Sequence, residues 1–101
     1  MHSKRASLTR DAAEVIAAQG LAFLAQEPAQ LSRFLSVTGL DVSDLRRLAD
    51  APEVLGAVLE YLTRDESLLL AFAANASVAP ETVTEALRIL EGPRWERSSE
   101  A

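Results

Sequence analysis

The stretch PEVLGAVLEYL, residues 52–62, carries the pattern that decides the fold class. Its apolar side chains recur at intervals of three, four and seven residues, which places them on one face of an α-helix. Pro52 suits the first position of a helix, where the backbone N–H has no partner within the helix. The buried face would consist of Val54, Leu55, Val58, Leu59 and Leu62.

Similar apolar stripes continue on both sides, separated by capping and breaking residues. Asp65 is a predicted N-cap, and Gly39 can take the positive φ that often ends a helix. Gly20 has two interpretations, a close crossing by another helix or a tolerated glycine on a weak stretch. The predicted helices span 9–25, 28–38, 43–49, 52–63, 65–76 and 80–91. No segment alternates with period two, so we predict an all-α fold, a compact bundle of about five to six short helices.

Length and composition indicate one domain. The chain has 101 residues, of which 49% are hydrophobic, mostly Ala and Leu. We expect a helical domain at 9–92, a flexible basic N-terminal arm at 1–8 and a flexible C-terminal tail at 93–101. One core would bring together the larger apolar residues of five helices, namely Phe23, Leu24, Phe34, Leu35, Leu59, Leu62, Phe72 and Leu87.

The charge pattern restricts the partners. Net charge is -5, and residues 11–90 hold twelve acids against five arginines. An acidic body repels phosphate backbones and anionic lipid. The apolar run at 68–74 is too short to cross a bilayer, and the basic start lacks the apolar stretch of a signal peptide. We therefore expect a cytoplasmic protein with neither a membrane nor nucleic acid as its partner.

Residues that could carry out catalysis are scarce. The chain has no Cys, and its single His is His2. The acids that cluster in sequence stand at helix starts, where capping and the helix dipole explain them: Asp41, Asp44, Asp50, Glu53, Asp65 and Glu66. We predict that the protein is not an enzyme and that it has no cofactor or metal site.

An alternative function is suggested by residues 73–88, which resemble a helix-turn-helix of repressor type. Ser77 would occupy the turn, and Thr82, Thr84 and Arg88 could contact DNA. Against this, glycine suits such a turn better than serine, and only Arg88 offers a basic contact on the second helix, which also carries acids. An ordinary corner between two helices explains the same spacing.

The predicted helix at 65–76 is apolar on more than one face. Leu68, Leu69 and Leu70 follow one another at ~100° intervals around the helix, so they cannot all face one neighbour. Either other helices surround this one or a leucine is left for a partner. Trp95, between Arg94 and Arg97, is a second possible contact, although such a residue also folds back onto its own domain or stays exposed. The preferred function is a small non-enzymatic protein-interaction or regulatory module, binding another protein or a second copy of itself.

The middle of the chain also resembles a known family. The run LAFLAQEPAQLSRFLSVTGLDVSDLR (21–46), followed by EVLGAVLEYLTRDESLLLAFA (53–73), is similar to a bacterial family of short proteins known only as a domain of unknown function. The resemblance covers roughly residues 20–80. It implies a small helical bacterial protein, and it supplies no catalytic residue, cofactor or partner.

Overall fold

The computed structural model describes residues 8–92, and every regular element in this range is a helix. The predicted all-α fold is therefore confirmed, with boundaries within one residue of those expected. The six helices are α1 (Arg10–Ala25), α2 (Pro28–Thr38), α3 (Val42–Leu48), α4 (Pro52–Thr63), α5 (Glu66–Ala76) and α6 (Pro80–Glu91). The predicted arm at 1–8, apart from Leu8, and the predicted tail at 93–101 lie outside the described residues.

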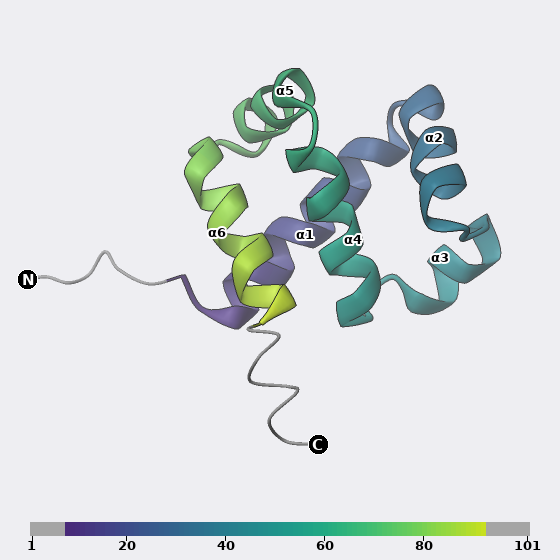
Figure 1. Cartoon of the computed structure of the whole chain (residues 1–101), viewed down its shortest axis with the longest axis horizontal. Coiled ribbons are helices and arrows are strands. Elements are labelled where there is room, and N and C mark those ends of the chain that lie inside the picture. The colour runs from purple at the N-terminus through teal and green to yellow at the C-terminus, as the bar shows by residue number, and fades with distance from the viewer. Residues whose placement is uncertain (1–7, 93–101) are drawn as a thin grey trace, which may run out of the picture.

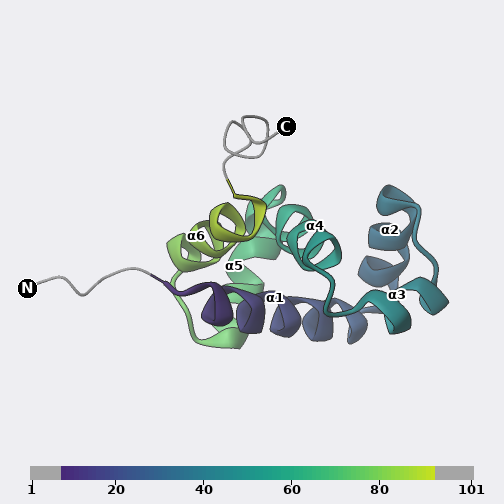
Figure 2. The same ribbon diagram turned by 90° about the horizontal axis from the view of Figure 1, so that it is seen from below.

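Helix α1 lies along one side of the molecule, below α6, α5 and α4 in Figure 2. Helices α4 and α6 pack on α1 and on each other, and α5 contacts all three. Figures 1 and 2 show α2 and α3 at the opposite end of this arrangement from α6.

The crossing of α1 and α4 is close because α1 carries glycine at position 20. Gly20 is buried, and a Cβ atom there would lie 2.9 Å from Cδ1 of Leu62 and 3.0 Å from Cγ1 of Val58. Such separations are shorter than the ~3.5–4.0 Å optimum for carbon atoms. Of the two interpretations of Gly20, the close helix crossing is the correct one.

The core lies between α1, α4, α5 and α6, with Phe34 entering from α2. The larger residues with essentially no exposed surface are Leu24, Phe34, Leu59, Leu62, Phe72, Val58 and Val83. Phe23, Leu35 and Leu87 are partly buried and pack against this cluster. The ring centroids of Phe23 and Phe72 lie 5.5 Å apart, as do those of Phe34 and Tyr61. The eight predicted residues thus meet in one core.

Helix ends follow the expected local chemistry. Gly39 ends α2 with a φ of 78°, and its N–H donates to the carbonyl of Leu35. The side chain of Thr9 accepts from the N–H of Ala12, which caps α1. Asp41 is the N-cap of α3, and its side chain accepts from the N–H of Asp44. These caps confirm that the chain is divided where its polar residues indicated.

Candidate interaction surfaces

The three consecutive leucines of α5 have different surroundings. Leu68 and Leu69 are half-buried and pack against the core. Leu70 points outward, with 48% of its surface exposed. Of the two possibilities left by the sequence, enclosure of the whole helix by its neighbours is therefore wrong, since the described helices leave Leu70 uncovered.

Leu70 belongs to a wider surface that we call the outer α5 face. It consists of Ser67, Leu70, Ala71 and Ala74, which follow the spacing of one helix side and are all exposed. No charged residue occurs from Ser67 to Pro80. The solvent-facing side of a surface helix is normally charged or polar, and interface centres are depleted of charge. This face has the composition of a contact surface.

The corner between α5 and α6 has the backbone of the predicted turn. Ser77 is the only non-glycine residue with positive φ in the described range, with φ 59° and ψ 42°. The N–H of Val78 donates to the carbonyl of Ala73 at 3.0 Å, and that of Ser77 to the carbonyl of Ala74 at 3.2 Å. This pattern of bonds closes a helix on a left-handed residue. The expectation that Ser77 would occupy a turn that requires positive φ is confirmed.

The residues predicted to contact DNA do not form one exposed basic surface. Thr82 is half-buried, whereas Thr84 and Arg88 are exposed. Side chains two residues apart on a helix are rotated by ~200° around its axis, so Thr82 and Thr84 point in different directions. Arg88 forms an ion pair with Glu85 of the same helix, which reduces the charge available for a phosphate.

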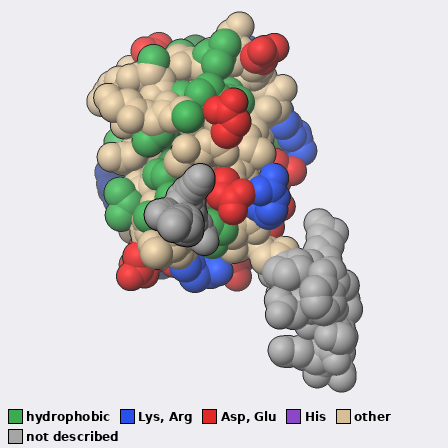
Figure 3. All heavy atoms as spheres, turned by 90° about the vertical axis from the view of Figure 1, so that its left-hand side faces the viewer, with side chains coloured by type: hydrophobic (Ala, Val, Ile, Leu, Met, Phe, Trp, Pro, Cys, Tyr) green, Lys and Arg blue, Asp and Glu red, His purple; other side chains and the backbone are tan. Residues whose placement is uncertain are grey.

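Charges elsewhere follow the same pattern of local pairing. On the face shown in Figure 3, the visible basic side chains lie apart from one another and next to acidic ones. Besides Arg88, three arginines form ion pairs within their own helices: Arg10 with Glu14, Arg47 with Asp44, and Arg64 with Glu60. Exposed pairs of this kind contribute little to stability, but each of them places a carboxylate beside an arginine.

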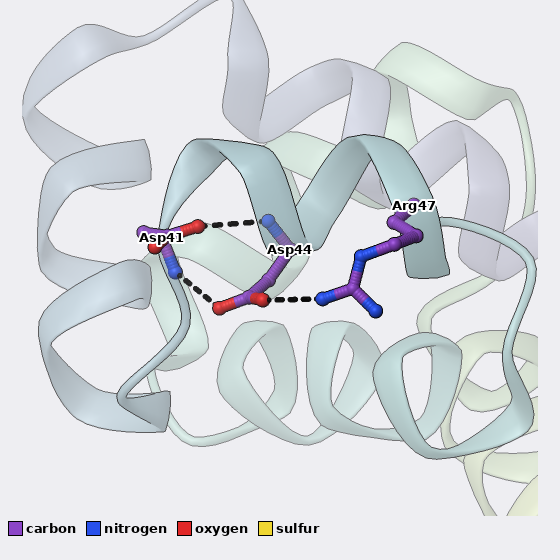
Figure 4. A network of polar contacts seen from close by, with 3 residues as sticks. All are labelled: Asp41, Asp44 and Arg47. Carbon is purple, nitrogen blue, oxygen red and sulfur yellow. Dashed lines mark hydrogen bonds and ion pairs between the residues drawn. The ribbon is translucent and has the colours of Figure 1, made fainter.

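Several of the clustered acids perform a structural task. Asp41 accepts from the N–H of Asp44, and Asp44 in turn accepts from the N–H of Asp41 and from Arg47 (Figure 4). Asp65 accepts from the N–H of Leu68. Such bonds satisfy N–H groups that have no partner within a helix. Among residues 8–92, no three His, Cys, Asp or Glu side chains gather in a way that could hold a metal ion.

A hollow lies above α4, and we call it the α4 groove. Its volume is about 500 Å³, and it is lined by Arg10, Pro52, Glu53, Gly56, Ala57, Glu60, Leu90 and Glu91. Its apolar surface comes from Pro52, Leu90 and the small residues Gly56 and Ala57, and its charged residues are three Glu and one Arg. The sequence pattern did not predict this groove. Two small residues beside the buried stripe of α4 were the available signal, but the walls come from α1 and α6.

A smaller hollow of about 180 Å³ lies between α2, α4 and α5. Tyr61 and Leu68 line it together with Val37, which is 58% exposed. The hydroxyl of Tyr61 donates to the side-chain carbonyl of Gln30 at 2.8 Å. Leu68 therefore faces this hollow and not the outer α5 face, so the predicted group of leucines is divided between two surfaces. Trp95, the fourth member of the predicted partner surface, lies outside the described residues.

Fold and surfaces together define a small all-α domain that presents one uncharged helix face and one acidic groove. None of its helices within residues 8–92 is both long and apolar enough to cross a membrane. The chain belongs to the family described as Protein of unknown function (DUF3572), whose model matches residues 10–93. This membership confirms the resemblance seen in the sequence. Comparison with curated proteins gives no significant match, and comparison with solved structures gives none either.

Proposed function

We propose that this protein is a non-enzymatic interaction module that pairs with a second copy of itself through the outer α5 face. The observation that carries the proposal is the exposure of Leu70 on a helix side whose members, Ser67, Leu70, Ala71 and Ala74, are all uncharged. An exposed leucine side chain gains free energy when another apolar surface covers it. A regulatory role follows if pairing depends on the concentration of the protein in the cytoplasm.

A second copy fits the shape of this face. In a two-fold contact, both copies use the same surface: residue i of the first copy contacts residue j of the second, and residue j of the first contacts residue i of the second. With α5 antiparallel to its partner, Leu70 of each copy would lie over Ala74 of the other, with Ala71 near the axis. The small alanines would admit the leucine and allow the two helices to approach closely.

The size of the face sets the strength of the pairing. Helix α5 has 11 residues, so it is about 16 Å long and ~10 Å wide. The area of one side of such a helix, the product of its length and width, is well below the ~800 Å² that each partner buries in a standard stable interface. We therefore expect a weak dimer with a dissociation constant of roughly 1 mM, or about 4 kcal/mol of binding free energy.

Sedimentation of the full chain at increasing concentration tests the proposal. The wild type should show a rising average mass, and Leu70→Glu should abolish the rise because it places a charge in the apolar contact. Val42→Glu is the matched control, since Val42 is 51% exposed on α3, at the other end of the molecule (Figure 1). A monomer at every concentration, or equal loss in both variants, would contradict pairing through α5.

DNA binding is the second candidate, and the observation that favours it is the left-handed conformation of Ser77. A helix-turn-helix requires such a corner, and Thr84 and Arg88 are exposed on the helix that follows. We prefer protein pairing because Arg88 is held by Glu85 and because residues 8–92 carry thirteen acids against six arginines. Affinity for DNA depends on neutralised phosphates.

A further inference from the structure

The α4 groove lies where the described part of the chain ends. Leu90 and Glu91, the last residues of α6, form one wall of the groove. Gly92 follows with a φ of 65°, a conformation outside the helix. Residues 93–101 therefore start at the rim of the α4 groove.

Distance allows these residues to reach the groove floor. Three residues in extended conformation span at most about 10 Å, which brings residue 95 that far from Gly92. Helices α4 and α6 pack against each other, and the axes of packed helices lie ~8–10 Å apart. The side chain of Trp95 can thus cross from the end of α6 to Gly56 and Ala57 on α4.

The chemistry of the two surfaces is complementary. The segment PRWER, residues 93–97, holds a large aromatic side chain, two arginines and Glu96, and so carries one more positive than negative charge. The groove offers small residues at its floor and the carboxylates of Glu53 and Glu60 beside them. Among the described residues, Glu53 has no ion-pair partner. Trp and Arg are also the residues that most often dominate binding energy at protein interfaces.

The other undescribed segment is a poorer occupant. Residues 1–7 also start near the groove, since Arg10 is part of its lining. They contain no Phe, Tyr or Trp to fill an apolar floor. The guanidinium of Arg10 already contacts Glu14 and the carbonyl of Ile89.

We propose that the α4 groove is a binding site for the chain's own residues 93–97, with the Trp95 side chain on Gly56 and Ala57 and with Arg94 and Arg97 near Glu53 and Glu60. This inference concerns a different surface from the outer α5 face and does not depend on the pairing of α5. It gives the single tryptophan of the chain a place in the fold. It also means that the groove is filled by a segment of the same chain.

Trp95 is the only tryptophan, so tryptophan fluorescence of the full chain reports on the surroundings of this one side chain. We expect the emission to be shifted to the blue, and quenching by acrylamide to be several-fold weaker than for a synthetic peptide of residues 93–101. Gly56→Leu should fill the groove floor, because nothing lies within 4 Å of a Cβ placed there. In this variant the quenching should rise to the level of the peptide while the helical circular dichroism stays unchanged.

Two further variants test whether the α4 groove itself shields Trp95. Ala18→Leu adds the same side chain at an exposed position of α1 and should leave the shielding of Trp95 as in the wild type. Glu53→Lys should raise the quenching several-fold without filling the floor, because it replaces the attractive charge with a repulsive one.

Three results would overturn the proposal. One is a wild-type Trp95 that is quenched as strongly as the peptide. Another is a shielded Trp95 that Gly56→Leu does not expose, which would place it elsewhere. The last is shielding that disappears on dilution, which would assign the occupant to a second copy.

Discussion

Replacing Gly20 and Gly56 with alanine, one at a time, separates helix propensity from packing in this fold. Both glycines lie inside helices, α1 and α4. In an exposed helix interior, alanine is more stable than glycine by roughly 0.8–1.0 kcal/mol. Gly56→Ala should show this gain in full, because a Cβ there has no atom within 4 Å. One methyl group also leaves most of the groove of about 500 Å³ open.

Gly20→Ala gains the same helix propensity, but its added Cβ atom overpacks the crossing of α1 and α4. Its Cβ would lie 2.9 Å from Leu62 Cδ1 and 3.0 Å from Val58 Cγ1. Both neighbours are fully buried, so neither can move aside into solvent. Overpacking of this kind costs ~1–3 kcal/mol. The net change should be a loss of about 0–2 kcal/mol, and the two variants should differ by ~1–3 kcal/mol.

Urea denaturation followed by circular dichroism measures both free energies of unfolding, with the slope checked for a constant m-value. In thermal unfolding the same difference amounts to at least ~4 °C in Tm for a domain of this size. If Gly20→Ala stabilised the protein as much as Gly56→Ala does, the close contact between α1 and α4 would be incorrect.

Three other measurements test the helix end, the core and the DNA alternative. Gly39→Val should lower the free energy of unfolding by more than ~1 kcal/mol, because a β-branched residue tolerates the φ of 78° badly; an unchanged denaturation midpoint would refute this. Phe34→Ala and Phe72→Ala should each cost ~3–5 kcal/mol, since both side chains are fully buried; a loss under about 1 kcal/mol at either site would contradict their place in the core. In fluorescence anisotropy with a labelled DNA duplex at ~50 mM salt, we expect no micromolar binding; salt-sensitive binding that Arg88→Glu abolishes would favour the helix-turn-helix.

The helices could be predicted because local chemistry specifies their ends. Asp65 caps α5, Pro52 and Pro80 start α4 and α6, and Gly39 ends α2, each through backbone groups within a few residues. The stripe of α4 then identified its buried face. Signals of this kind act over short stretches, so one sequence is enough to read them.

The surfaces could be predicted only in part, because they depend on how distant helices pack. The sequence showed that Leu68, Leu69 and Leu70 could not share one neighbour, but it could not show that Leu70 is the exposed one. The α4 groove combines residues as far apart as Arg10 and Glu91. No local pattern relates such residues, since their proximity follows from the packing of α1, α4 and α6.

The most direct test of the central claim is an amide NMR spectrum of the full chain recorded at increasing protein concentration. Pairing through the outer α5 face predicts concentration-dependent shifts centred on Ser67, Leu70, Ala71 and Ala74, with α2 and α3 unaffected. The same titration of Leu70→Glu should show no such shifts. Spectra that do not change with concentration, or shifts centred on another helix, would contradict the claim that α5 presents the contact surface of this protein.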